Sequence, residues 1–147
     1  MFLGQYYHNL DDKGRLTIPA RFRELLAADG AYIMQGFDKN LIVLLSPTYD
    51  SISQSISEIS MTDRTGRMLR RLVYSTADRV EVDKVGRILI PQFLREFASL
   101  ESSAVIVGNG DYFEIWSPEL WGEETEQLQD VQLTADRFSG VKLNSTP

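Results

Sequence analysis

Alternating apolar and polar positions, separated by turns that contain Asp and Gly, predict short strands along most of this chain. In residues 5–18, two β-prone runs, YYHNL and RLTI, lie on either side of DDKG. Asp opens a turn there and Gly14 supplies the residue with positive φ, so we expect a hairpin whose tip is Asp11–Arg15. Pro19 then precedes apolar residues at helical spacing, and Gly30 is expected to end that helix. A second hairpin over 31–47 completes a β-β-α-β-β unit.

The same pattern returns 72 positions later. The stretch DDKGRLTIPARFRE at 11–24 corresponds to DKVGRILIPQFLRE at 83–96, and Ser46-Pro47 corresponds to Ser117-Pro118. We therefore divide the chain into a first repeat at 5–47 and a second at 76–118. Two units are too few for an open solenoid, and each is too small to be stable alone. The two repeats are expected to share one core as a pseudo-dimer.

Helices are predicted in the segments outside the repeats. In the linker, 48–75, Ser46 is expected to cap a helix with an apolar stripe, and Thr62 or Asp63 to cap a second one. The last segment, 119–147, is expected to form an acidic helix with Trp121 exposed or half-exposed, followed from Asp136 by a poorly ordered tail.

Composition limits the classes of protein that fit. The chain has 147 residues, 43% of them apolar, with no Cys and one His, which excludes disulfides and Cys-based zinc sites. No secretory signal and no long apolar run is present, so we expect a cytoplasmic protein that does not contact a membrane. The net charge is −6, but acids gather at 119–136 while arginines gather at 64–71. A local basic surface is compatible with this distribution, although a solvated helix face would explain the arginines equally well.

The turns supply the candidate chemistry. Arg15 and Arg87 follow Gly14 and Gly86 on a rigid β element, from which a guanidinium can bond a guanine edge or a phosphate in two places. The remaining candidates for DNA contact in the first repeat are Lys13, Arg21 and Arg23. The alternative is that Asp11 and Asp83 pair with these arginines only to hold each hairpin, an interaction that contributes about 0–1 kcal/mol at a surface. The residues alone leave both interpretations open.

The two motifs, with the opening MFLGQYYHNLDDKGRLTIP, resemble the SpoVT/AbrB-type swapped-hairpin DNA-binding module, and their two-copy arrangement is similar to the MraZ family. The resemblance covers the chain from Met1 to about Asp130. It implies a β-rich α+β fold in which the repeats form a pseudo-dimeric, double-ψ-like barrel. It also implies a nucleoid-associated transcriptional regulator, assembled as a ring, that binds direct repeats upstream of its own division and cell wall operon and represses it. In this interpretation Asp11, Gly14, Asp83 and Gly86 shape the loops.

An enzyme and a protein-binding scaffold are the two other classes of function to compare with a DNA-binding regulator. An enzyme is not expected, because no nucleophile, phosphate-loop or dinucleotide pattern occurs, and Asp11 and Asp12 point to opposite faces of an extended segment. No cofactor, metal or small-molecule substrate is expected either. An oligomeric protein-binding scaffold remains the alternative, because swapped-hairpin modules also serve as partner-binding units in antitoxins.

Overall fold

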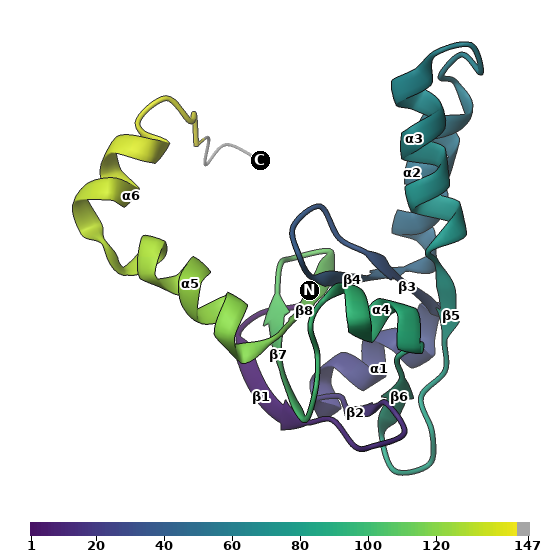
Figure 1. The fold of residues 1–147 in the computed structure, drawn as a ribbon, viewed down its shortest axis with the longest axis vertical. Coiled ribbons are helices and arrows are strands. Elements are labelled where there is room, and N and C mark those ends of the chain that lie inside the picture. The colour runs from purple at the N-terminus through teal and green to yellow at the C-terminus, as the bar shows by residue number, and fades with distance from the viewer. Residues whose placement is uncertain (144–147) are drawn as a thin grey trace.

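The computed structural model describes residues 1–143 and shows a mixed α+β fold with two repeats of one element order (Figure 1). The first repeat contains β1 (Gln5–Asn9), β2 (Arg15–Thr17), α1 (Ala20–Asp29), β3 (Ala31–Gln35) and β4 (Leu41–Leu45). The second contains β5 (Asp78–Val80), β6 (Arg87–Leu89), α4 (Gln92–Phe97), β7 (Ser103–Gly108) and β8 (Tyr112–Trp116). The helices outside the repeats are α2 (Ser46–Ser57), α3 (Arg64–Ser75), α5 (Pro118–Gln129) and α6 (Val131–Phe138).

Strand pairing crosses between the repeats. One antiparallel sheet has the order β1-β7-β8-β4-β3-β5, and a second consists of β2 and β6 alone. The predicted β3–β4 and β7–β8 hairpins are confirmed. The predicted pairing of β1 with β2 is wrong, and so is that of β5 with β6, because each turn forms but its strands then diverge to partners elsewhere. Isolated bridges, Leu10–Leu16 and Val82–Ile88, are what remains of these two hairpins.

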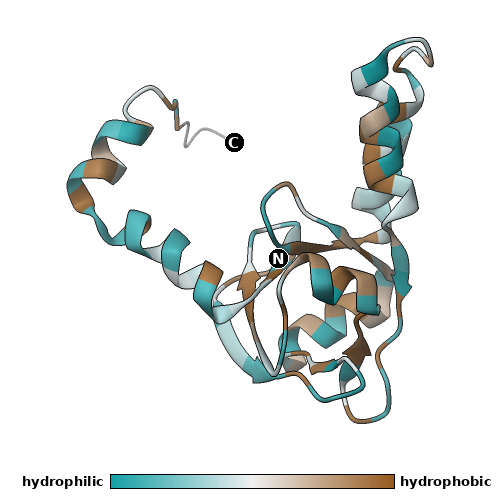
Figure 2. Ribbon diagram, in the orientation of Figure 1, coloured by the Kyte–Doolittle hydropathy of each residue, from teal (hydrophilic) through white to brown (hydrophobic). Residues whose placement is uncertain are grey.

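The shared core lies on one face of the six-stranded sheet, where both repeats contribute side chains. Alternate residues of the strands, such as Val43 on β4 and Ile106 on β7, meet Leu16 and Ile88 from the two-stranded sheet. Helices α1 and α4 cover this core, and Phe22 of α1 lies 5.2 Å from Phe113 of β8 between ring centroids. Figure 2 shows the apolar residues of strands and helices gathered toward the centre of this body. The expectation that neither repeat has a core of its own is met by this mixed cluster.

The opposite face of the sheet carries two separate apolar patches. Helices α2 and α3 cover one patch on β3 and β4, where Tyr49 is buried and donates a hydrogen bond to the carbonyl of Val73. Helix α5 covers the other patch, on β7 and β8. Trp121 of α5 packs on Trp116 and is only 6% exposed, so the predicted exposure of this side chain is wrong. Because α5 docks at its first turns, Trp121 belongs to the fold rather than to a free surface.

Most helices begin or end at the residues that the sequence predicts. Gly30 ends α1 with φ of 74°, and Asp63 caps α3 by accepting from Gly66 N at 2.9 Å. Ser46 is already inside α2 rather than capping it, whereas the equivalent Ser117 does cap α5. The predicted tail is wrong at its start, since α6 continues to Phe138. Within residues 1–143 no helix has the length and apolarity needed to cross a membrane.

Candidate nucleic-acid interface

The two-stranded sheet brings both signature arginines to one surface. In the β2–β6 register, Arg15 lies opposite Leu89 and Thr17 lies opposite Arg87. Leu16 and Ile88 point inward and are 0% and 1% exposed, so the alternate residues face outward. The outward face therefore presents an arginine from each repeat, with Thr17 and Leu89 beside them. A two-stranded antiparallel ribbon of this kind has the width that the major groove of B-DNA admits.

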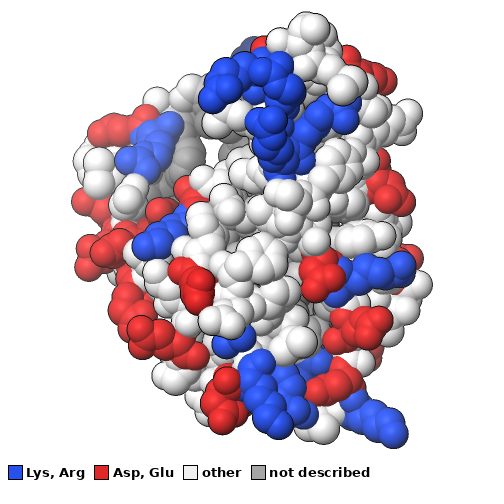
Figure 3. All heavy atoms as spheres, turned by 45° about the vertical axis from the view of Figure 1, so that its right-hand side comes forward, with Lys and Arg blue, Asp and Glu red and all other residues white. Residues whose placement is uncertain are grey.

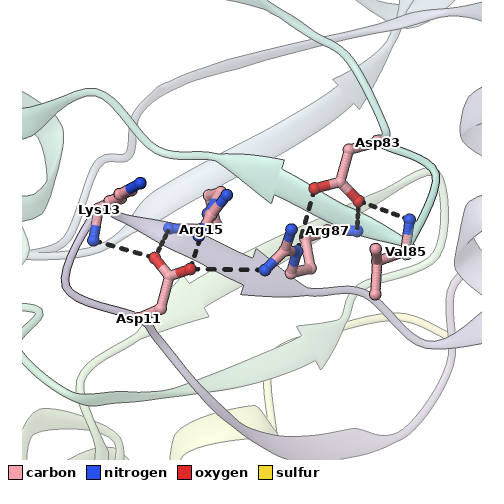
Figure 4. A network of polar contacts seen from close by, with 6 residues as sticks. All are labelled: Asp11, Lys13, Arg15, Asp83, Val85 and Arg87. Atoms are coloured by element: carbon pink, nitrogen blue, oxygen red, sulfur yellow. Dashed lines mark hydrogen bonds and ion pairs between the residues drawn. The ribbon is translucent and has the colours of Figure 1, made fainter.

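An aspartate holds each turn through backbone and side-chain hydrogen bonds (Figure 4). Oδ1 of Asp11 accepts from the N–H of Lys13 at 3.0 Å and of Arg15 at 2.8 Å, while its Oδ2 accepts from Nε of Arg15 at 2.7 Å. Asp83 does the same in the second turn, accepting from Arg87 N at 2.9 Å and from Arg87 Nε at 3.0 Å. Each aspartate thus fixes both the turn and the orientation of its arginine.

The two turns are also linked to one another. Oδ2 of Asp11 lies 3.6 Å from Nη1 of Arg87, which makes an ion pair between the repeats. In the part of the chain that the structure describes, no hydrogen bond involves the terminal nitrogens of either Arg15 or Arg87. The aspartates therefore occupy the Nε edge of each guanidinium, and Nη1 of Arg87 also faces Asp11. The remaining Nη groups are left for an external acceptor.

The hydrogen bonds of the turns lower the pKa of both aspartates. For Asp11 the main cause is the hydrogen bond from the backbone N–H of Arg15, and for Asp83 the main cause is the equivalent bond from Arg87. Burial acts in the opposite direction and is the weaker influence in each case. Both carboxylates are therefore ionised at neutral pH, as an acceptor of several N–H groups requires.

Each turn packs against the other repeat at its glycine. The carbonyl of Gly86 accepts from Ile18 N at 3.0 Å, and the carbonyl of Gly14 accepts from Ile90 N at 2.8 Å. Arg23 of α1 lies against Gly86, where an added Cβ would overlap its guanidinium. In the same way Arg95 of α4 lies beside Gly14 and donates from Nε to the carbonyl of Ile90 at 3.0 Å. The two turns therefore form one rigid unit with approximate twofold symmetry.

The structure brings together most of the basic residues named from the sequence. Arg15 and Arg87 lie 3.6 Å or less from the same carboxylate, and Lys13 is exposed at the tip of its turn. Arg21 is exposed on α1, and Arg23 is half-buried beside the second turn. The sequence reasoning missed Arg95 and Lys84, although the 72-residue offset that links Arg23 to Arg95 was the available signal. Lys84 is exposed in the second turn, one position before the residue equivalent to Lys13.

Charge is unevenly distributed over the molecular surface. Figure 3 shows Lys and Arg side chains gathered at the lower end, where Figure 1 places the two turns, and again on the helical arm at the top. Acidic side chains follow the left-hand edge of the same view, and some also lie beside the bases at the lower end. Basic side chains thus reach the surface at the turn end of an acidic protein, interspersed with acidic ones.

The fold and the turns together define a class, that of two-repeat α+β proteins whose turns interlock. The model of the MraZ protein family, described as antitoxin-like, matches the chain twice, over residues 1–72 and 73–142. The chain therefore belongs to the MraZ family of transcriptional regulators. This membership confirms the resemblance found from the two motifs and the expectation that the protein is not an enzyme.

Curated relatives agree over most of their length. The "Transcriptional regulator MraZ" of Thermomicrobium roseum is 44% identical over 128 residues, which cover 87% of this chain and 89% of the relative. The protein of the same name from Roseiflexus castenholzii is 46% identical over 121 residues, covering 82% and 84%. That from Leuconostoc mesenteroides is 40% identical over 141 residues, covering 96% and 94%.

Proposed function

We propose that this protein regulates transcription by inserting the β2–β6 ribbon into the major groove of DNA. The observation that supports this most directly is the pair of arginines, one from each repeat, held by aspartates on the outward face of a single ribbon. A guanidinium whose Nε is already bound to a carboxylate has lost most of its rotamer freedom, so less entropy is lost when its Nη groups bond a guanine. The aspartates then act by orienting Arg15 and Arg87, and not only by closing the turns.

The surrounding bases would position the ribbon without reading sequence. Lys13 and Arg21 are exposed, and they extend the basic surface from the first turn onto α1. In this proposal they contact phosphates on either side of the groove, and Arg23 contributes mainly by supporting the second turn. Lys84 gives the second turn an exposed base of its own.

The target that fits best is a set of short direct repeats upstream of the protein's own operon, with repression as the outcome. One ribbon per molecule offers few contacts, so useful affinity requires several copies acting together. We infer a ring of copies that face the same way along the DNA, since tandem repeats match a head-to-tail assembly. We propose that it acts in the cytoplasm, at the nucleoid.

We further propose that residues 5–47 and 76–118 together form a double-ψ-like barrel, with 48–75 as a helical linker and 119–147 as an acidic appendage. Support comes from the two strand exchanges, β1 with β7 and β2 with β6, which tie each repeat to the other. The acidic appendage is expected to face away from DNA.

A fluorescence-anisotropy titration tests the proposal, using DNA from upstream of the gene, scrambled DNA and several salt concentrations. Arg15→Ala and Arg87→Ala should each weaken specific binding by about 1–3 kcal/mol, while Lys13→Ala should weaken both DNAs alike and lower the salt slope by about 1. Lys39→Ala, in the β3–β4 turn, is the matched control and should change neither. Full specific affinity in Arg15→Ala would refute the ribbon. Absence of binding to either DNA would favour the scaffold alternative.

A further inference from the structure

The outer face of the six-stranded sheet contains a trough that no residue of the described chain fills. Two hollows, of about 420 and 410 Å³, lie between the arm formed by α2 and α3 and the helix α5. They share the lining residues Asp38 and Glu114, so they lie next to each other across β4 and β8, and together we call them the trough. Its apolar walls come from side chains that include Phe37, Ile42, Leu44, Tyr112 and Leu128.

The charged groups of this trough are all acidic. Asp38, Asp111, Glu114 and Glu124 line it, and no Lys or Arg is among its lining residues. Burial raises the pKa of Glu114, and the nearby charges of Asp38 and Glu124 raise it further. Negative charge is therefore concentrated here without compensation, beside exposed apolar side chains such as Phe37, which is 73% exposed.

Helix α3 carries the complementary pattern on its outward face. Arg64, Arg67, Met68 and Arg71 recur at the spacing of one helical face, and Met68 is 55% exposed. At about 100° per residue this face lies opposite Val73, which packs toward the sheet. None of the three arginines forms an ion pair with any residue in 1–143. This face of α3 is therefore basic with one apolar side chain at its centre, whereas the trough is acidic with apolar walls. The two surfaces are complementary in charge and in polarity.

The trough of the same molecule cannot be the partner of this face. The side of α3 that bears Gly66 and Val73 is held against α2 and the sheet, so the exposed Arg64 and Arg71 face away from it. Arg67 is half-buried and donates from Nη1 to the carbonyl of Met61 at 3.0 Å. A second copy of the chain can supply the arginines to the trough while offering its own trough to another molecule.

We propose that the outward face of α3 docks in the acidic trough of a second copy, as an amphipathic helix in a groove. Met68 would contact the apolar wall while Arg64 and Arg71 face Asp38, Asp111 and Glu114. The two surfaces differ, so the contact is heterologous and each copy uses one of each. This inference rests on the self-association in the proposed function and assigns a surface to it.

Charge-reversal variants with mutual rescue test the contact. Arg64→Glu/Arg71→Glu changes the arm, and Asp38→Lys/Asp111→Lys changes the trough; all four side chains are exposed and make no hydrogen bond among the described residues. Each variant alone should raise the concentration at the midpoint of assembly by about tenfold or more, measured by light scattering after size-exclusion chromatography. An equal mixture of the two should recover the mass of the wild-type assembly, because reversed arms meet reversed troughs.

Glu123→Lys/Glu126→Lys is the matched control, because it changes the net charge by the same amount on α5 but outside the trough. It should leave the mass of the assembly unchanged. A wild-type protein that stays monomeric at all concentrations would overturn self-association altogether. Association that survives both reversals, or a mixture that fails to recover, would overturn only this contact. If the arm variant kept its mass and lost DNA affinity, α3 would be a DNA surface and the inference would be wrong.

Discussion

Replacing Gly14 by alanine should destabilise the protein more than the same change at Gly86 or Gly110, two other turn glycines with positive φ. Gly14 has φ of +84°, a conformation that costs a residue with a side chain about 1–2 kcal/mol. A Cβ there would also lie 2.9 Å from the carbonyl oxygen of Ile90 and 2.6 Å from Nε of Arg95. The backbone of the second repeat would have to move, at a cost of about 1–3 kcal/mol. We expect Gly14→Ala to lower the free energy of unfolding by about 2–4 kcal/mol in total.

Three other glycines serve as comparisons that separate these contributions. Gly110 has φ of +86° but nothing within 4 Å of an added Cβ, so Gly110→Ala should cost only the conformational part, about 1–2 kcal/mol. Gly122 lies in α5 with nothing near it, and Gly122→Ala should stabilise by about 0.5–1 kcal/mol. At Gly86 the atoms nearest to an added Cβ belong to the flexible side chain of Arg23, so the cost should lie between those of Gly110 and Gly14.

Urea unfolding followed by circular dichroism measures the free energy of unfolding of the wild type and of each of the four variants on the intact chain. The urea midpoint should fall in the order Gly122→Ala, wild type, Gly110→Ala, Gly86→Ala, Gly14→Ala, with a constant m value. A cost for Gly14→Ala no larger than that for Gly110→Ala would refute the conclusion that the two turns are interlocked. The same variant should also lose DNA affinity, because Arg15 follows Gly14 directly.

Three further predictions follow from the electrostatics and the C-terminal helices. Asp11→Ala should lower the urea midpoint and the specific DNA affinity, whereas Asp12→Ala, at the adjacent exposed residue, should change neither. Because the pKa of Asp11 is lowered in the folded protein, its contribution to stability is present above the usual pKa of 3.8 and is lost as the pH falls through the pKa of the folded state. Glu114→Gln should raise the melting temperature at neutral pH, because a raised folded pKa makes the ionised group oppose folding; below the usual 4.5 no gain should be seen by calorimetry. Truncation after Asp130 should leave anisotropy-measured DNA affinity unchanged, since it removes α6, whose residues are mostly exposed and lie outside both repeats, and spares Trp121; a large loss would contradict this.

The local features of the fold were predictable from the sequence, and the pairings over long distances were not. Asp11 and Gly14 specify a turn through the chemistry of neighbouring residues, so that turn was found correctly. The partners of the flanking strands depend on which apolar faces are buried together. The apolar side chains of these strands, such as Tyr6 and Leu16, could pack equally well against a strand of their own repeat or of the other repeat. A hairpin with adjacent strands was the simplest inference, and it failed for that reason.

The same division applies to the candidate site. Arg15 and Arg87 could be named because each stands beside a glycine turn. Their common position on one ribbon, and the ion pair of Asp11 with Arg87, follow only from the exchange of strands. Trp121 was misjudged because an acidic helix with one aromatic residue gives no sign of the Trp116 ring that covers it.

The exchange of strands also determines the order of events during synthesis. Strand β1 pairs with β7, about a hundred residues further along the chain, so it leaves the ribosome well before its partner exists. At about 5–20 residues per second, the wait lasts roughly 5–20 s. During that interval the edges of β1 and β2 are unpaired. The β7 and β6 strands of a neighbouring nascent chain offer edges that match them. A messenger translated by closely spaced ribosomes therefore offers each first repeat a foreign second repeat before its own, and dimers exchanged in this way are the expected by-product of rapid expression.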